Sequence, residues 1–321
     1  MKIRLNESFY TFVSNAGNSI ECLVNGDKVL MQSQVMPGVV VEDSFDLVDM
    51  SDALDFSISR DVAKLLTGGS LLAVKASEDE LSLCSMSSDM TYYTTVKTSV
   101  RAVFTHEIHD KSGGQVLEWS DLLGLIYNAN KYKTNVYVQG GIAWCRPHNL
   151  LSIAEQSDLP DLCIPQYLCS ILVRNRDAKL VMLPDALEVQ LGNVTITQDK
   201  YRVMPDEETA ACFNAGGELF SVRVNVAQIL STCRSIPKVQ SVLMNFGGLE
   251  ATIVSDMANV EVTVGFGISE CTNLDAMKAT TFSLPLDFIA GLPKDCEYIT
   301  IFIYKYHSML TLGSMRFFYA R

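Results

Sequence analysis

The stretch that decides the fold is Asp55–Cys84, with the sequence DFSISRDVAKLLTGGSLLAVKASEDELSLC. Its first residues alternate between apolar and polar side chains as a short strand does, and Ser59 stands where a helix N-cap is expected. Arg60–Leu66 then predicts an amphipathic helix whose apolar face carries Val62, Leu65 and Leu66. A short strand therefore leads into a helix of about two turns.

The second half of the same stretch predicts antiparallel strands. Gly68 and Gly69 end the helix, and the alternating segments Leu71–Val74 and Leu81–Cys84 follow, joined by an acidic turn. A further strand is expected at Tyr92–Val96. The unit is thus a helix with an attached β-meander, which cannot bury both faces of its sheet alone.

The same unit recurs along the chain. Six copies can be recognised, at a mean spacing of about 56 residues, with helix cores at Phe9, Val62, Leu122, Leu168, Val226 and Phe288. Two such units, with both helices on one sheet face, would form a domain of about 107 residues, one third of the 321-residue chain. We therefore predict an α+β protein of three tandem domains, each with two helices packed on antiparallel sheet, at residues 1–107, 108–205 and 206–321. The polar segments His106–Gly114 and Met204–Gly217 are expected to link them.

Composition sets further limits. The chain carries 25 basic and 37 acidic side chains, a net charge of -12, which argues against a protein whose whole surface binds nucleic acid. A basic patch on one face stays compatible with that charge. Nine scattered cysteines without a CxxC pair indicate reduced thiols in a reducing compartment. No signal peptide or membrane-spanning run is visible, so we expect a cytoplasmic protein, in the host cytoplasm if it is viral.

Several short motifs occur in the order found in one known family. They are the hairpin end Trp144–Leu150, the step Cys163-Ile164-Pro165 before a helix, the segment Tyr201–Pro205, and a helix at Val224–Arg234 that opens the third domain. In this order they resemble the bacterial DNA polymerase III β sliding clamp over essentially the whole chain. Two departures stand out: Tyr201–Pro205 has one arginine fewer than the family pattern, and a different tail, Met315–Arg321, ends the chain. The resemblance favours a divergent clamp, from a virus or a mobile element.

The resemblance implies a function through topology. Two subunits would close into a homodimeric ring that encircles duplex DNA and tethers a replicative DNA polymerase as its processivity factor. DNA polymerase and clamp loader would dock through short apolar peptides, without membrane contact. A clamp-like scaffold for transcription, repair or checkpoint factors is the alternative within the same fold.

In such a ring the helices line the hole and would carry basic residues. The cations near the predicted helices are Arg60, Lys64, Lys131, Lys133, Arg174, Arg176, Lys179, Arg234, Lys238 and Lys294. The alternative is that cations near helix C-termini only complement the helix dipole, worth roughly 0.3–1 kcal/mol each. The first predicted helix has no cation between Glu7 and Ile20, so the pattern is incomplete.

The resemblance also implies a peptide-binding cleft between the second and third domains. Its walls would be Arg146, Pro147, His148, Leu150, Tyr201, Arg202, Val203, Met204, Met315, Phe317 and Phe318. Ordinary core and inter-domain packing is the alternative, above all for Leu150, Val203 and Met204. Phe317 and Phe318 are adjacent on one strand, so only one of them can line the cleft.

Enzymatic and client functions are less well supported. The sequence has no nucleotide-binding glycine loop and no catalytic triad context, so we expect neither an enzyme nor a cofactor. The most metal-like cluster, His106–Asp110, lacks helical zinc spacing, and no metal site is expected. Phe282–Leu286 resembles the peptide that clamp clients insert, although its place in the repeat predicts a strand entering the sixth helix.

Overall fold

A computed structural model of the chain describes most of its residues. These are residues 1–106, 109–145, 150–155, 158–200, 217–228, 231, 242–247, 250–257, 260–277, 281–284, 297–304, 307–312 and 315–320. The described chain divides into two compact units. Unit 1 consists of residues 1–120 and 167–201, and unit 2 consists of residues 121–166 and 202–321.

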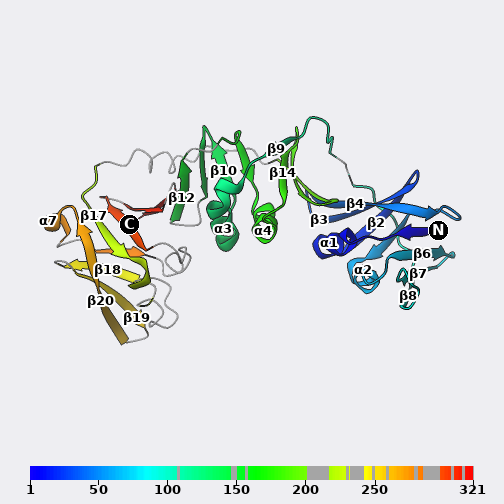
Figure 1. Cartoon of the computed structure of the whole chain (residues 1–321), viewed down its shortest axis with the longest axis horizontal. Helices are drawn as coiled ribbons and strands as arrows, with labels where there is room; N and C mark the ends of the chain where they lie inside the picture. The colour runs from blue at the N-terminus through cyan, green and yellow to red at the C-terminus, as the bar shows by residue number, and fades with distance from the viewer. Residues whose placement is uncertain are drawn as a thin grey trace. The chain divides into compact units, whose positions relative to one another are not determined.

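Unit 1 contains a sheet of 12 strands among its described residues (Figure 1). Nine strands follow the order β8-β7-β6-β1-β4-β16-β15-β14-β9, and β2, β3 and β5 join beside β4. Every pair in the sheet is antiparallel. The strands are β1 (Lys2–Arg4), β2 (Ser19–Asn25), β3 (Lys28–Met36), β4 (Val39–Asp49), β5 (Phe56–Ser59), β6 (Leu71–Ala76), β7 (Glu80–Met86), β8 (Tyr93–Ser99), β9 (Gln115–Leu117), β14 (Lys179–Met182), β15 (Ala186–Leu191) and β16 (Val194–Asp199).

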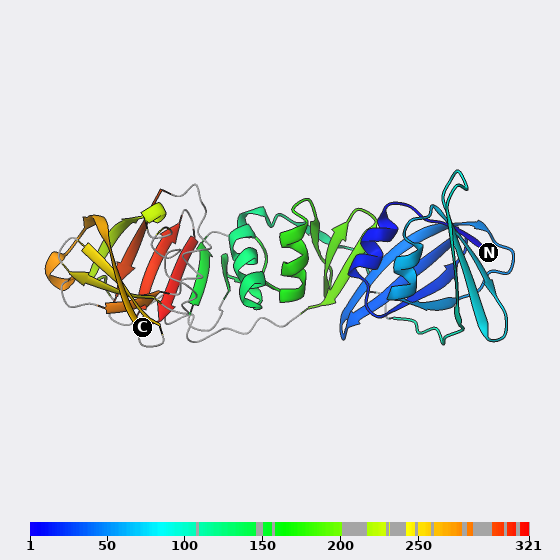
Figure 2. The same ribbon diagram turned by 90° about the horizontal axis from the view of Figure 1, so that it is seen from below.

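Three helices cover one face of this sheet, α1 (Ser8–Asn15), α2 (Arg60–Leu66) and α4 (Gln166–Arg174), seen in front of the strands in Figure 2. The rings of Phe9 in α1 and Phe45 in β4 meet edge to face with centroids 5.7 Å apart. Phe45 therefore points toward the helices, and alternate residues of β4, including Glu42, point to the opposite face. The core of unit 1 lies between the helices and the sheet, with Phe9, Phe12 and Phe45 among its largest buried side chains.

The helix that decided the sequence analysis forms as predicted at its ends. Ser59 is the N-cap of α2, and its hydroxyl accepts a hydrogen bond from the Val62 amide at 3.3 Å. The predicted apolar face was wrong in one position, because Ala63 and Leu66 are buried whereas the side chain of Leu65 is 58% exposed. A two-turn helix offers only a narrow buried stripe, and Ala63 occupies the place assigned to Leu65.

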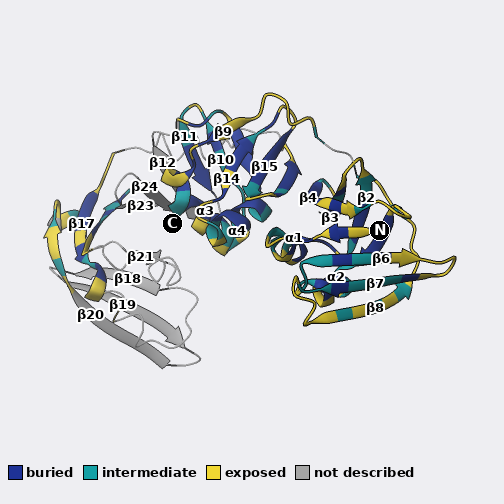
Figure 3. Ribbon diagram, turned by 45° about the vertical axis from the view of Figure 1, so that its right-hand side comes forward, coloured by how far each residue is buried: buried dark blue, intermediate teal, exposed yellow. Residues whose placement is uncertain are grey.

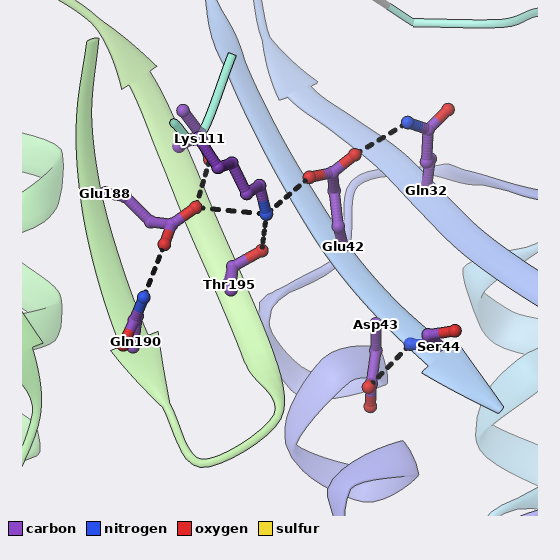
Figure 4. A network of polar contacts seen from close by, with 9 residues as sticks. Gln32, Glu42, Asp43, Ser44, Lys111, Glu188, Gln190 and Thr195 are labelled. Atoms are coloured by element: carbon purple, nitrogen blue, oxygen red, sulfur yellow. Dashed lines mark hydrogen bonds and ion pairs between the residues drawn. The ribbon is translucent and has the colours of Figure 1, made fainter. Parts of the chain in front are cut away.

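The face of the unit 1 sheet opposite the helices carries a polar row. Cross-strand pairs join Glu21 to Gln32, Gln32 to Glu42, Glu42 to Thr195 and Thr195 to Gln190 across five strands. The predicted linker 106–114 contributes Lys111, whose Nζ lies 3.2 Å from Glu42 Oε2 and donates to Thr195 at 3.1 Å (Figure 4).

Lys111 also pairs with Glu188 of β15, with its Nζ 3.1 Å from Oε2. Burial lowers the pKa of Lys111, and the charges of Glu42 and Glu188 raise it, so that the net shift of this pKa is upward. Glu42 and Glu188 are themselves buried and accept further hydrogen bonds from Gln32 and Gln190, both at 2.7 Å. One linker cation thus balances two buried carboxylates from strands on either side of the predicted domain boundary.

His109 of the same segment lies between two other carboxylates. Its Nδ1 lies 3.1 Å from Asp185 Oδ2, and its Nε2 lies 3.0 Å from Asp199 Oδ1. The hydrogen bond with His109 lowers the pKa of Asp185. Over the residues that can be described, no three His, Cys, Asp or Glu side chains are arranged to hold a metal ion. In the metal-like cluster His106–Asp110, two residues, 107 and 108, lie outside the described chain.

Unit 2 contains a second antiparallel arrangement, again of 12 strands in its described part, in the order β13-β10-β11-β12-β24-β23-β22-β17-β20-β19-β18-β21. The helix α3 (Leu123–Tyr132) follows a short 3₁₀ turn at Ser120–Leu122, and α7 is Leu274–Met277. The strands are β10 (Val136–Gln139), β11 (Ile142–Cys145), β12 (Leu150–Glu155), β13 (Leu162–Ile164), β17 (Phe220–Asn225), β18 (Val242–Gly247), β19 (Glu250–Met257), β20 (Val260–Cys271), β21 (Thr281–Leu284), β22 (Tyr298–Ile303), β23 (His307–Leu312) and β24 (Met315–Ala320).

One predicted helix of unit 2 begins later than expected. Val224 and Asn225 end β17 and pair with Ile299 and Tyr298 of β22, so the helix expected from Val224 starts at Val226. Asn225 supplies the turn, because its Oδ1 accepts a hydrogen bond from the Gln228 amide at 3.1 Å. An alternating strand and a helix start overlap in this sequence, and strand pairing decides the boundary.

Buried residues follow the sheets in both units (Figure 3). In unit 2, Trp144 and Met309 form a buried cluster against which Tyr137, Ile142, Phe302 and Tyr304 pack. Trp144 stacks on Tyr137 with ring centroids 5.8 Å apart. Among the described helices, none has both the length and the apolar character needed to cross a membrane.

Strand pairing crosses both predicted domain boundaries. β4 of the predicted first domain pairs with β16 of the second, and β12 of the second pairs with β24 of the third. The two compact units therefore each take one part of the predicted middle domain. The division into three domains at 1–107, 108–205 and 206–321 stays a prediction.

Candidate nucleic-acid interface

The exposed sides of the helices in each unit are the candidate interface: α1, α2 and α4 in unit 1 and α3 in unit 2, a set of helices that we call the helix layer. These helices contain four basic residues, Arg60, Lys64, Lys131 and Arg174, and a single acidic residue, Asp61. In the whole chain acidic residues outnumber basic residues 37 to 25. The described helix layer therefore has the opposite charge balance from the rest of the protein, as a surface that meets phosphates requires.

Arg60 is tied to the end of another helix. Its Nε donates to Val13 O at 3.0 Å, and its Nη2 donates to Ser14 O at 2.5 Å. These are carbonyls of the last turn of α1, which have no partner inside the helix and carry the negative end of its dipole. Arg60 thus performs the structural role named as the alternative, complementing the end of a helix.

Lys64 has an exposed side chain on α2. Its Nζ lies 2.9 Å from Asp61 Oδ1, one turn earlier on the same helix. The side chains are 54% and 89% exposed, so this pair contributes little to stability. A DNA phosphate could replace Asp61 as the partner of Lys64 at small cost.

Arg174 ends α4 with an exposed side chain, and its Nε donates to Ser170 O at 2.9 Å. Burial raises the pKa of Tyr167, at the start of the same helix, while the charges of Arg174 and Arg60 act to lower it. Coulomb effects fall off steeply over about 10 Å. The charges of Arg60 of α2 and Arg174 of α4 thus act on the same phenol, although the sequence separates the two arginines by more than a hundred residues.

In unit 2, Lys131 and Lys133 are exposed at the end of α3. Lys131 belongs to the helix itself, and its Nζ lies 5.2 Å from the centroid of the Tyr132 ring. Lys133 is the C-cap residue with a positive φ of 58°, and its amide donates to Ala129 O. The left-handed backbone ends the helix and leaves the Lys133 side chain exposed.

Of the other predicted cations, two lie among the described residues and three lie outside them. Arg176 is exposed in the loop after α4, and Lys179 is an exposed residue at the start of β14, so both lie beyond the end of the helix. Arg234, Lys238 and Lys294 lie outside the described residues.

Of the residues predicted to line the peptide cleft, the structure describes only those in strands β12 and β24. The register of β12 and β24 places Leu150 opposite Tyr319, Ser152 opposite Phe317, and Leu151 opposite Phe318. Alternate positions of a strand share a face, so positions 150, 315 and 317 form one set and position 318 belongs to the other. The predicted residues Arg146, Pro147, His148, Tyr201, Arg202, Val203 and Met204 lie outside the described residues.

Position 318 falls on the face of the Trp144 cluster. Met309 of that cluster is the cross-strand partner of Phe318, and Leu310 is the partner of Phe317. The opposite face carries Cys145, whose thiol lies 3.8 Å from Leu125 O of α3. That face is therefore the side of the sheet covered by the helix. The two adjacent phenylalanines are thereby assigned to different faces, which the sequence left open.

The stretch Phe282–Leu286 was the basis of the client alternative. Phe282, Ser283 and Leu284 lie in β21 and pair with Met244, Leu243 and Val242 of β18. This is the strand that the repeat predicts. Pro285 and Leu286 lie outside the described residues.

Sequence analysis missed the tyrosines of the helix layer. Tyr10 on α1 and Tyr127 on α3 have side chains that are 67% and 50% exposed, and Tyr167 on α4 is half-buried. The available signal was helical spacing, since Tyr127 precedes Lys131 by four residues and Tyr10 falls between the buried Phe9 and Phe12.

Comparison with known proteins links this fold to one group of solved structures. The chain is similar to DNA polymerase III subunit beta from Pseudomonas aeruginosa, with a TM-score of 0.74 at 13% identity, over 100% of this chain and 99% of that one. It is also similar to a putative DNA polymerase III beta subunit from Eubacterium rectale, with a TM-score of 0.75 at 10% identity, over 100% and 99% of the two chains.

A third structure carries the name of the fold. A DNA polymerase sliding clamp from Pseudomonas aeruginosa matches with a TM-score of 0.73 at 12% identity, over 98% of this chain and 96% of that one. No family model and no curated protein matches the sequence. The chain therefore has the mixed α/β fold with antiparallel sheets of DNA polymerase III β sliding clamps, at sequence identities that establish the fold alone.

Proposed function

We propose that the protein is a sliding clamp, a ring that encircles duplex DNA and tethers a replicative DNA polymerase. The observation that carries this proposal is the charge balance of the helix layer, which is basic in a chain of net charge -12 and lies on the fold of sliding clamps. The function needs no catalytic group, because enclosure holds the DNA.

The helix layer suits a protein that slides. Nonspecific attraction between cations and phosphates has no preferred register along the duplex, so a ring can move without breaking sequence-specific contacts. Acidic residues elsewhere on the chain would repel DNA from the outside of the ring. The described helices α1, α3 and α4 contain no acidic residue that would oppose binding.

Ring closure would join two copies of the chain. β8 ends the described sheet of unit 1 and pairs on one side only, with β7. A strand with one unpaired edge readily accepts another strand, and a closed ring removes that edge. We infer a homodimer in which β8 of one copy pairs with an edge strand of the predicted third domain of the other.

The peptide cleft completes the proposal. Positions 150, 315 and 317 fall on one face of the β12–β24 pair, and we infer that they line the cleft for apolar peptides of a polymerase and a clamp loader. Phe318 is assigned instead to the face of the Trp144 cluster.

Topological trapping tests the proposal. The full chain, loaded on nicked circular DNA by an added loader or by transient ring opening, should stay bound at high salt and leave when the circle is linearised. Its mass in solution should be that of two chains. A strict monomer that leaves circular and linear DNA equally fast would contradict the proposal.

The alternative within the same fold predicts a different partner. A scaffold for transcription, repair or checkpoint factors would also be trapped on circular DNA, but it would not lengthen the products of a replicative polymerase. Primer extension on a long template, with and without the protein, separates the two functions.

A further inference from the structure

Solvent-facing tyrosines recur on the described helices. Four of the chain's 12 tyrosines, Tyr10, Tyr127, Tyr132 and Tyr167, lie on α1, α3 and α4. Three of them reach the solvent side, with Tyr10 67% exposed, Tyr127 50% exposed and Tyr167 half-buried. Tyr10 and Tyr127 are thus exposed on a helix of unit 1 and a helix of unit 2, and half-buried Tyr167 also reaches the helix surface, so each can contact a ligand there.

Two of these three tyrosines have a cation farther along the same helix. On α3, Tyr127 and Lys131 are four residues apart and share a side of the helix, and both are exposed. On α4, Tyr167 and Arg174 are seven residues apart, two turns along one side.

On α1 the cation comes from a neighbouring helix. Arg60 of α2 donates to Val13 O and Ser14 O, one turn beyond Tyr10, and therefore takes the place that a cation of α1 would occupy. Arg60 therefore supplies the cation that the first helix lacks, since the helix sequence SFYTFVSN carries no charge. Thus α1, α3 and α4 each combine a tyrosine with a cation nearer the end of the helix, supplied by α2 in the case of α1.

The phenol and the cation differ in how they bind a phosphate. A tyrosine hydroxyl donates a hydrogen bond to a phosphate oxygen without adding charge, so it releases no counterion from the DNA. Burial raises the pKa of Tyr167, opposed by Arg174 and Arg60, and the hydroxyl stays protonated as a donor near neutral pH.

We propose that Tyr10, Tyr127 and Tyr167 bind phosphates of the enclosed duplex by hydrogen bonds, each beside the phosphate held by its partner cation. The inference rests on the proposed clamp function and goes further, because it assigns phosphate contacts to residues without charge. It accounts for how an acidic chain with few cations on its helices can hold DNA.

The test separates the phenols from the cations by salt dependence. A labelled short duplex is titrated with the full-length chain at several salt concentrations between about 50 and 300 mM, where the slope of log K against log[salt] is about -0.9 per cation–phosphate contact. The variant Tyr10→Phe/Tyr127→Phe/Tyr167→Phe keeps every ring and removes three hydroxyls. It should bind about tenfold or more weakly at each salt concentration, with an unchanged slope.

Two other variants serve as references. Lys131→Gln/Arg174→Gln should reduce the magnitude of the slope by about 1.8, since two charges are lost. Tyr298→Phe removes the hydroxyl of a 36% exposed tyrosine on strand β22, which pairs with a strand on each side and lies outside the helix layer, and it should leave both affinity and slope unchanged.

The outcomes distinguish the two proposals. If the unaltered protein binds the duplex and the triple phenylalanine variant binds equally well, the tyrosine contacts are wrong and the clamp function stands. If the triple variant changes the slope, the phenols act through charge and the inference is also wrong. If the unaltered protein itself fails to bind the short duplex at the lowest salt, the tyrosine contacts are wrong, and the trapping experiment on circular DNA decides the clamp function separately.

Discussion

Lys111 Nζ lies 3.1 Å from Oε2 of Glu188, on the face of the sheet opposite the helices. Lys111 belongs to the predicted linker, whereas Glu188 belongs to strand β15. The same nitrogen lies 3.2 Å from Oε2 of Glu42, whose strand β4 pairs with β16 across the predicted boundary between the first two domains. The linker segment therefore stabilises the sheet as well as connecting the two predicted domains, because Lys111 neutralises carboxylates from both sides of their boundary.

Replacing Lys111 should destabilise unit 1. In Lys111→Met, two buried carboxylates face each other without a cation, and we expect a loss of about 2 kcal/mol in the free energy of unfolding, less than for a fully buried pair because Lys111 is 43% exposed. Urea unfolding followed by circular dichroism measures the change. The triple variant Lys111→Met/Glu42→Gln/Glu188→Gln should recover most of the loss.

An exposed pair provides the matched control. Lys97 and Glu80 lie 2.8 Å apart with side chains 65% and 47% exposed, and Lys97→Met should change the unfolding free energy by under about 1 kcal/mol. Equal losses in Lys97→Met and Lys111→Met would show that burial of Glu42 and Glu188 does not matter.

Asp43 should make stability depend on pH. Burial raises the pKa of Asp43 from 3.8, while hydrogen bonds from Ser8 and the Ser44 amide act to lower it. A carboxyl whose pKa is raised on folding stabilises the fold at low pH, and that contribution is lost as pH rises through the folded pKa. In Asp43→Asn the amide oxygen can still accept from the Ser44 amide, and the NH2 group would donate to the Ser8 hydroxyl in place of accepting from it. This variant should therefore gain stability relative to the unaltered protein between about pH 4 and pH 7.

Asp89 gives the opposite expectation as a control. Hydrogen bonds from Ser87 and Thr91 lower the pKa of Asp89 to about 2. Its contribution is present above the unfolded pKa and is lost as pH falls toward 2, so Asp89→Asn should lose stability near neutral pH. A stability difference for Asp43→Asn that does not change with pH would contradict the assigned burial.

Arg60 should act on stability as well as on DNA. Arg60→Met removes the hydrogen bonds to Val13 O and Ser14 O, and the end of α1 should lose about 1 kcal/mol. Thermal unfolding measures the loss, and DNA binding should weaken in parallel. Arg176→Met, at an exposed loop position with no assigned structural contact, should leave the melting temperature unchanged. Equal melting temperatures for the two variants would contradict the structural role assigned to Arg60.

Substitutions of Phe317 and of Phe318 should affect two different properties, peptide binding and thermal stability. We expect Phe317→Ala to weaken binding of an apolar clamp-binding peptide by about tenfold, because position 317 shares a face with positions 150 and 315. Phe318→Ala should mainly lower the melting temperature, because position 318 is paired with Met309 of the Trp144 cluster. Peptide binding by calorimetry, together with thermal unfolding of each variant, decides the assignment; the reverse pattern would exchange the two roles.

The sequence by itself determined the local plan of the protein. Ser59 and the periodicity of Arg60–Leu66 predicted α2 with its cap, and the alternating segments after it became β6 and β7. Gly192, with a φ of 64°, lies in the tight turn between β15 and β16, where the Gly192-Asn193 pair is a local signal for a hairpin. These features depend on neighbours a few residues apart, so backbone preferences and side-chain periodicity suffice to predict them.

Only the tertiary structure decided which distant residues meet. The pairing of β4 with β16, the approach of Lys111 to Glu42 and Glu188, and the hydrogen bonds from Arg60 to the end of α1 join segments that are far apart in the chain. No local pattern encodes such a register, because strand pairing and helix packing are selected by burial of the whole sheet. The same reason explains Leu65, which has the periodicity of a core residue and is exposed since the sheet beneath α2 reaches only Ala63 and Leu66.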